Sequence, residues 1–360
     1  MPQTIRPLDN ILVLDLTRLL PGAVATQWLV DFGAEVVKIE QPGVGDYARH
    51  GFLGPKVNPI FAFTNRGKKS VEIDLKDSAG RDSFLRLVDR ADVLIEGFRP
   101  DVMDRLGVGY ETLRLRNPRL IYAALTGYGA EGKYAELAGH DINYLALSGV
   151  LDLMGPSEKP ALAGIQIADL AGGSMQAVIG ILLALEARHR TGQGQRVDVS
   201  MFHGSCAMLP VPLAEFLGAG KPPERGNQML SGKYACYQIY EAAGGTFVAV
   251  GALEPKFWQN LCTELGCPEL IADQYAPEPR QSELKRTLAR IFKGATAEEW
   301  FARLGSKDCC ITPVRNLKDA CPDHDPRPIP FLSETRGVRS GDAPKLGEHT
   351  REFLEANRES

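Results

Sequence analysis

The sequence predicts an α/β fold, in which a large domain is built on a parallel sheet and a smaller α+β domain follows it. Short aliphatic segments alternate with stretches of helical spacing over residues 11–200, and a glycine-turn hairpin follows a linker rich in glycine and proline. Alternating strands and helices favour a parallel sheet with helices on both faces. At roughly 150 residues per domain, the 360 residues suffice for two domains.

The chain opens with a strand–helix–strand pattern. Residues 11–16 (ILVLDL) are predicted as a strand, the pair Pro21-Gly22 as a break, and residues 23–32 as a helix. Gly33 then ends the helix, and residues 34–39 (AEVVKI) form the second strand. This order begins a βαβ unit.

Further strands are predicted at residues 91–95, 120–125 and 197–200, the first two after helical stretches. The best helix covers residues 170–190, because apolar residues recur along it at helical spacing and basic residues close its C-terminal end.

The smaller domain begins after the linker at residues 218–226 (GAGKPPERG). Residues 234–251 form two strands joined at Gly244-Gly245, helices follow up to about residue 304, and the proline-rich residues 321–330 continue no helix. We therefore divide the chain into a large domain (1–217), a linker with a small α+β domain (218–330) and a C-terminal segment (331–360).

The composition argues against several classes of protein. Lysine and arginine total 41 and aspartate and glutamate 45, a net charge of −4, whereas a nucleic-acid-binding protein usually shows a basic excess. No apolar run approaches the ~18 residues of a membrane span, and the N-terminus has no apolar signal core, so we expect a cytoplasmic chain. The seven cysteines form no CxxC pair and the histidines no zinc spacing, so we expect reduced thiols and no metal.

A βαβ start with Glu40 at the end of the second strand also raises the possibility of a nicotinamide dinucleotide site. The first turn, residues 17–22 (TRLLPG), lacks the G-x-G-x-x-G pattern that lets a backbone approach a pyrophosphate. We therefore interpret Glu40 as a polar strand end.

Two candidate catalytic residues lie where a helix is about to begin. His140 follows Gly139, which allows close approach of a ligand, and Asp141 can cap the next helix. Asp169 directly precedes the 170–190 helix, whose dipole favours an ionised carboxylate. As an alternative, each of the two is a packed or capping residue at a helix start.

Glycines and a third acidic residue extend this pattern. Gly172 and Gly173 remove side chains where a ligand could approach the backbone. Glu254 precedes Pro255, which suits a first helical position, and its alternative role is that of a surface acid at a helix start.

A neutral histidine facing an ionised aspartate is suited to moving a proton between the two faces of one carbon. One group removes a proton and the other returns a different one, so both need pKa values near the working pH. The carbanion between them needs its carbonyl stabilised, and the helix starts after Gly139 and Asp169 could supply backbone donors.

Two long segments identify a family. Residues 139–155 (GHDINYLALSGVLDLMG) and 169–195 (DLAGGSMQAVIGILLALEARHRTGQGQ) closely resemble the α-methylacyl-CoA racemases of the class III CoA-transferase (CaiB/BaiF-type) superfamily. The resemblance runs from LDLTRLLPG through VGALEPKFW and weakens after about residue 310. It implies a large Rossmann-like domain, a residue 331–360 segment that returns to it, and an interlocked homodimer with active sites shared between subunits.

The resemblance also implies the roles of individual residues. His140 is the base for one face of the α-carbon, Asp169 is the base for the other, and Glu254 is the partner of the histidine from the other subunit. No cofactor is implied beyond the CoA of the substrate. Its contacts are expected from Lys38, Ile73, Asp74, Leu75, Lys76, Gly97, Phe98, Arg99, Arg105, Gly139, Asp141, Ile142, Asn143 and Tyr144.

Two departures from the family pattern stand out. Lys38 takes a position that is often arginine, and lysine lacks the bidentate guanidinium fork. Residues 46–63 form a longer segment than in some racemases and are more like the CoA-transferases. The basic stretch of residues 65–69 (NRGKK) is expected near the same site.

The expected function is interconversion of (2R)- and (2S)-2-methylacyl-CoA thioesters by proton transfer through an enolate. The alternative is a CoA-transferase in which Asp169 is the nucleophile, because the superfamily's transferases use a matching aspartate. His140 with Glu254 favours proton transfer, since transferases commonly carry tyrosine or another residue at the histidine position. A non-catalytic CoA-binding protein is a third class. The acyl pocket, with Leu20, Met208, Met229 and Leu230 as candidate walls, does not encode one shape.

Overall fold

The computed structural model describes residues 5–50, 58–321, 327–339 and 341–355, and the chain divides into two compact units. The first unit comprises Met1–Leu151, Ala163–Leu209 and Arg327–Ser360, and the second comprises Asp152–Leu162 and Pro210–Pro326. The boundary expected at 217/218 falls inside helix α9 (Pro210–Ala219), which belongs to the second unit.

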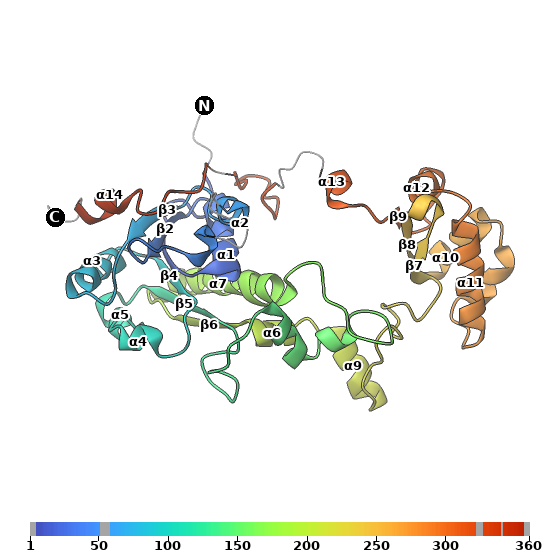
Figure 1. Ribbon diagram of the computed structural model, residues 1–360, viewed down its shortest axis with the longest axis horizontal. Coiled ribbons are helices and arrows are strands. Elements are labelled where there is room, and N and C mark those ends of the chain that lie inside the picture. Colours follow the sequence, from blue (N-terminus) through green and yellow to red (C-terminus); the bar gives the residue numbers. More distant parts are fainter. Residues whose placement is uncertain (1–4, 51–57, 322–326, 340, 356–360) are drawn as a thin grey trace. The chain divides into compact units, whose positions relative to one another are not determined.

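The first unit is built on a six-stranded parallel sheet with strand order β3-β2-β1-β4-β5-β6 (Figure 1). This is the strand order of the Rossmann-type doubly wound sheet, in which the winding reverses between β1 and β4. The parallel α/β architecture confirms the sequence prediction. The strands are β1 (Leu12–Leu16), β2 (Glu35–Glu40), β3 (Lys69–Glu72), β4 (Val93–Glu96), β5 (Ile121–Thr126) and β6 (Arg196–Ser200).

The central strands β1, β4 and β5 are almost continuously apolar, which is typical of a parallel sheet that is covered on both faces. Val13 and Val93 lie in the core shared with helices α1 (Leu19–Asp31) and α7 (Met175–Thr191). Leu14 and Leu94, one residue further along, lie in a second core shared with helices α3 (Ser78–Val88), α5 (Tyr110–Arg116) and α14 (Thr350–Glu355). The remaining helices of this unit are α2 (Pro59–Thr64), α4 (Val102–Arg105), α6 (Asp141–Ser148) and α8 (Met201–Cys206).

Helix α1 begins at Leu19, earlier than the sequence prediction placed it. The prediction that Pro21-Gly22 breaks the chain is therefore wrong. Proline is tolerated in the first turn, because the N–H that it lacks would have no partner there.

The longest helical stretch, Ala168–Thr191, combines a π-helical turn, η3 (Ala168–Ser174), with α7. Among the described residues it is the one helix long and apolar enough to cross a membrane, by length and composition alone. However, Ala177, Ile181 and Ala184 are buried in the core against the sheet. The stretch is therefore accounted for as a core helix of an α/β unit.

The C-terminal segment lies along the edge of the parallel sheet at β3. The N–H of His349 donates to the Ser70 carbonyl at 2.9 Å, and the Glu72 N–H donates to Thr350 Oγ1 at 3.0 Å. Phe353 inserts into the core behind these bonds. These bonds occupy backbone groups of an edge strand that would otherwise be open to another chain.

The second unit contains a three-stranded antiparallel sheet of order β7-β8-β9. Strands β7 (Tyr237–Glu241) and β8 (Phe247–Gly251) pair through a turn in which Gly244 and Gly245 both have positive φ, so the predicted hairpin is confirmed. The hydrophobic core of the second unit includes Trp258, Leu288 and Trp300. The other elements are α10 (Pro255–Glu264), α11 (Arg280–Phe292), α12 (Ala297–Leu304), β9 (Ile311–Pro313) and α13 (Leu317–Ala320).

Candidate active site

Two adjoining cavities open in the first unit beyond the carboxyl ends of β1, β4 and β5. The small cavity, about 340 Å³, is lined from the ends of β1 and β2 and from the residues after β3. The large cavity, about 740 Å³, is lined from the turn after β1, the loops after β4 and β5, and the start of α6. The two share Thr17, Arg18, Tyr47 and Phe98. Ligands of open α/β sheets bind in this position, where the winding reverses.

His140 lies on the wall of the large cavity as the residue before α6. Its backbone N–H donates to Asn143 Oδ1 at 3.1 Å, and the Asn143 N–H donates to the His140 carbonyl at 2.8 Å. These bonds fix the backbone at the helix start. The imidazole is exposed and available to a ligand.

Asp169 lies on the wall of the same cavity, so the structure brings the two predicted bases together. Its backbone N–H donates to Asp141 Oδ1 at 2.9 Å, which ties the Asp169 segment directly to the start of α6. The sequence predicted a different role for Asp141, as the cap of its own helix. The bond to Asp169 joins residues 28 positions apart, and no local pattern indicates it.

The electrostatics of Asp169 also differ from the expectation. Rather than preceding the helix, Asp169 lies within η3, and burial together with the nearby Asp141 carboxylate raises the pKa of Asp169 to about 6. The prediction that the helix dipole favours the ionised carboxylate of Asp169 is therefore wrong, because the pKa of this group is raised. A pKa near 6 suits a group that both accepts and returns protons at neutral pH.

The glycines near the two bases also allow close packing of the backbone, which adds to the role in ligand approach that the sequence predicted for them. A Cβ on Gly172 would lie 2.7 Å from the Met201 carbonyl oxygen, and one on Gly204 would lie 2.0 Å from the Gly172 carbonyl oxygen. A Cβ on Gly139 would lie 2.7 Å from the Tyr128 hydroxyl. Gly172 and Gly204 therefore let η3 and α8 approach closely, and Gly139 leaves room for Tyr128.

Tyr144 closes one side of the large cavity. Its hydroxyl donates to the Gly139 carbonyl at 2.7 Å, and its ring packs edge-on against Tyr128 at 5.0 Å between centroids. Burial and the nearby Asp169 carboxylate raise the pKa of Tyr144 to about 12. The phenol is therefore neutral at working pH and serves as a hydrogen-bond donor.

The predicted CoA-binding residues other than Lys38 fall into three groups. Residues 73–76 line the small cavity, and Gly97, Phe98, Arg99, Gly139 and Tyr144 line the large one. Arg105, Asp141, Ile142 and Asn143 lie outside both linings. Of the candidate acyl-pocket walls, Leu20 lines the large cavity, whereas Met208 does not, and Met229 and Leu230 belong to the second unit.

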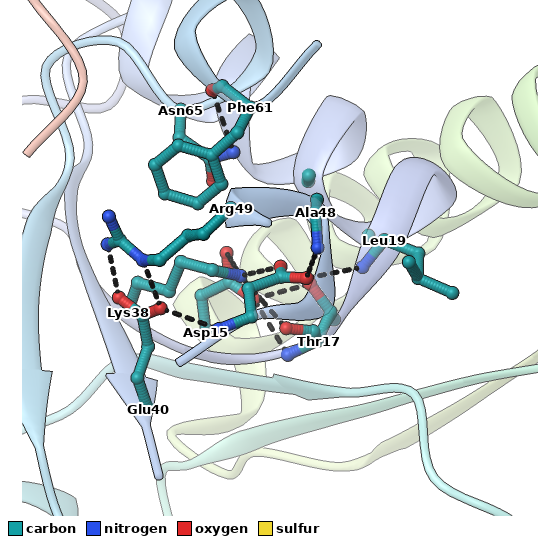
Figure 2. A network of polar contacts seen from close by, with 12 residues as sticks. Asp15, Thr17, Leu19, Lys38, Glu40, Ala48, Arg49, Phe61 and Asn65 are labelled. Carbon is teal, nitrogen blue, oxygen red and sulfur yellow. Dashed lines mark hydrogen bonds and ion pairs between the residues drawn. The ribbon is translucent and has the colours of Figure 1, made fainter. Parts of the chain in front are cut away.

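Lys38 is completely buried beneath the cavities rather than exposed to them. Its ammonium donates to the Thr17 carbonyl at 2.9 Å and pairs with Asp46 Oδ2 at 2.9 Å and Asp15 Oδ2 at 3.9 Å (Figure 2). A phosphate could reach Lys38 only by displacing these partners. The residues that line the small cavity from this strand end are Ile39, Glu40 and Gln41.

A buried ionic network surrounds Lys38. Lys68 pairs with Asp15 at 3.4 Å and donates to Thr26 Oγ1 at 2.7 Å, and burial lowers the pKa of Lys68 to about 8. Burial would raise the pKa of Asp15, but the Lys38 and Lys68 ammonium groups outweigh it, so that the pKa is lowered and the carboxylate stays ionised.

The same network extends to the end of β2. Arg49 binds the Glu40 carboxylate through two bonds of 2.6 and 2.7 Å (Figure 2). Glu40, interpreted from the sequence as a polar strand end, is thus a buried ion-pair partner. Of the longer segment at residues 46–63, residues 51–57 lie outside the described residues.

Glu254 belongs to the second unit, where it is exposed and immediately precedes α10. Pro255 occupies the first helical position, as expected. The partnership of Glu254 with His140 stays a prediction. Within the described residues, no three His, Cys, Asp or Glu side chains gather in a way that could hold a metal ion.

Comparison with known proteins decides the family. The family model described as CoA-transferase family III matches residues 8–350. The chain belongs to this family. It is 38% identical to the α-methylacyl-CoA racemase of Homo sapiens over 97% of this chain and 92% of the relative. It is also 38% identical to the acetyl-CoA:oxalate CoA-transferase of Acetobacter aceti, over 87% of this chain and 82% of that one.

Solved structures agree with this assignment. A CaiB/BaiF family protein from Brucella suis superposes with a TM-score of 0.85 at 30% identity, covering 98% of this chain and all of that one. The chain is therefore an enzyme of the CoA-transferase III superfamily, as the sequence predicted, and its family includes both racemases and CoA-transferases.

Replacing Asp141 by asparagine is expected to lower the pKa of Asp169. Asparagine keeps an oxygen that can accept from the Asp169 N–H but removes the negative charge, while burial of Asp169 is unchanged. Since proton abstraction by Asp169 requires its ionised form, the acid limb of kcat/KM for its epimer should move to lower pH. The exposed Glu111→Gln variant is the control, and an unmoved acid limb would count against the coupling.

Proposed function

We propose that this enzyme is a 2-methylacyl-CoA racemase that interconverts the (2R) and (2S) thioesters by proton transfer between two faces of C2. The observation that carries this proposal is that His140 and Asp169 both line the large cavity, with their backbone segments joined by the bond between the Asp169 N–H and Asp141. The curated racemases among the relatives support it at 38% identity over nearly the full chain.

The chemistry follows from the two bases. One of them takes the C2 proton, which is acidified by the thioester carbonyl, and an enolate forms. The other delivers a proton to the opposite face, so that C2 inverts while the C–S bond stays intact. An Asp169 with a pKa near 6 can act in both directions, because each form is accessible near neutral pH.

A second candidate is a CoA-transferase. It is favoured by the acetyl-CoA:oxalate CoA-transferase, which is as similar in identity as the racemase. Here the Asp169 carboxylate would attack the acyl-CoA carbonyl and release the CoA thiolate, giving a mixed anhydride. The thiolate would then attack the aspartyl carbonyl and expel the donor carboxylate, leaving an aspartyl-CoA thioester. The acceptor carboxylate would attack this thioester and release the thiolate, which would take the acceptor acyl group and regenerate Asp169. A pKa above that of a normal carboxyl makes Asp169 a more basic group, and His140 would have no evident part in this reaction.

The two candidates separate when no free carboxylic acid is supplied. A pure (2R)-2-methylacyl-CoA incubated with the enzyme should give both epimers, with the thioester retained. Hydroxylamine added during turnover should leave Asp169 unmodified. Modification of Asp169 that depends on acyl-CoA, without epimerisation, would establish the transferase instead.

We also propose that the enzyme is a homodimer. Helix α9 has no buried residue, and its exposed apolar side chains include Val211, Leu213, Phe216 and Leu217. An unpartnered apolar face of this kind marks a protein interface.

A further inference from the structure

Arg18 lies where the two cavities meet and lines both of them. The centre of its guanidinium group lies 5.0 Å from the ring of Tyr47 and 5.3 Å from the ring of Phe98. Its Nη1 donates to the Tyr47 hydroxyl at 3.1 Å. In the part of the chain that the structure describes, no carboxylate pairs with it, so the charge is held between two rings and left for an anion.

Buried side chains hold the backbone on both sides of Arg18 and Tyr47 through hydrogen bonds. Lys38 binds the carbonyl of Thr17, and Asp46 Oδ1 accepts the N–H groups of Leu19 at 3.0 Å and Ala48 at 2.9 Å (Figure 2). Arg18 and Tyr47 each lie between anchored residues. Leu19 has a φ of 61°, a conformation that non-glycine residues rarely adopt and that the surrounding bonds maintain.

We propose that Arg18 binds the diphosphate of the CoA thioester, and that the buried Lys38–Asp46 pair is the positioning device that holds Arg18 there. This rests on the proposed function in one respect, the location of the thioester beside His140 and Asp169 in the large cavity. The adenosine end then occupies the small cavity. The diphosphate, which joins adenosine to pantetheine, crosses the junction that Arg18 lines.

The chemistry of the residue supports this position. Guanidinium groups bind phosphate oxygens through two parallel N–H bonds, and they stack on aromatic faces, which keeps the fork oriented before the ligand arrives. The N–H of Leu19, in the first turn of α1, already donates to Asp46 Oδ1, so this backbone donor is not available to the anion. The side chain of Arg18 is therefore the cationic donor that lines both cavities at this junction.

The test measures binding of three ligands to the full chain by calorimetry. Arg18→Gln should weaken CoA about ten- to a hundred-fold, the range for a lost hydrogen bond to a charged group. It should weaken 3′-dephospho-CoA by the same factor, because both carry the diphosphate, and it should leave pantetheine unchanged. Arg18→Lys should lie between, since it keeps the charge and loses the fork. Arg190→Gln, on an exposed arginine at the end of α7, should change none of the three.

Three results would overturn the proposal. One is CoA binding by Arg18→Gln at wild-type strength. Another is a loss confined to CoA with 3′-dephospho-CoA unaffected, which would assign Arg18 to the 3′-phosphate. The third is an equal loss for pantetheine, which would indicate a general disturbance of the cavity. Because binding needs no turnover, an enzyme that fails to epimerise but shows the expected pattern would refute the racemase and keep Arg18 in this role.

Discussion

Replacing His140 by alanine is expected to stop conversion of one 2-methylacyl-CoA epimer into the other while sparing one half-reaction. In this variant Asp169 can still take the proton that faces it and return a solvent proton to the same face. One epimer should therefore exchange its C2 hydrogen without inverting, and the other should not exchange. Loss of a general acid or base typically costs about 10²- to 10⁴-fold in rate. Asp169→Ala should show the mirror pattern.

The measurement combines deuterium uptake at C2 by mass spectrometry with chiral separation of the thioesters, starting from each pure epimer. His189→Ala, an exposed histidine on α7, is the matched control and should behave as the wild type. Equal loss of exchange from both epimers in both variants would contradict a mechanism with one base on each face.

Replacing Lys38 by methionine is expected to destabilise the first unit by about 3–5 kcal/mol, the range for removing one partner of a buried ion pair. The variant leaves the Asp15 and Asp46 carboxylates buried without their nearest shared cation, since all three side chains are enclosed. The free energy of unfolding, followed by urea titration, should fall accordingly. CoA binding should weaken as well, because the loop of Arg18 loses its anchor at Thr17.

Two further variants make this result specific. Lys256→Met breaks an exposed pair with Asp308 at 3.0 Å in the second unit and should cost at most about 1 kcal/mol. Adding Asp46→Asn to Lys38→Met should recover part of the lost stability, because one unpaired buried charge is removed. A Lys38→Met variant as stable as Lys256→Met would show that the buried network does not hold the loops.

Much of the fold could be predicted from the sequence, because its strands are aliphatic and alternate with helices. The strand β3 could not, since its four residues (KSVE) carry charges at both ends and pair in the sheet only through β2. The start of α1 was missed for a different reason. The Pro21-Gly22 pair has the composition of a break, and only the bonds around Thr17 and Leu19 make it a first turn.

The residues of the candidate site also divide into those that the sequence predicted and those that it did not. His140 and Asp169 stand in long recognisable segments, and the structure brings them to one cavity. The sequence did not predict the partners of three aspartates, because each one bonds to a residue from another element. These are Asp141, Asp46 and Asp15. Lys38 was expected at a phosphate because the family resemblance implied it, and a cation at a strand end has the same sequence pattern whether it faces a ligand or a buried carboxylate. Arg18 stands in the LDLTRLLPG segment but was given no role there, because its proposed role depends on two rings that the fold brings to it.

The most direct test of two-base proton transfer is the fate of the C2 hydrogen in the wild-type enzyme in D2O. Starting from pure (2R)-2-methylacyl-CoA, without any carboxylic acid acceptor, the (2S) product should carry one deuterium at C2, and the two epimers should approach equal amounts. Thioesters recovered with their C2 hydrogen and configuration unchanged, across several 2-methylacyl chain lengths, would contradict the account.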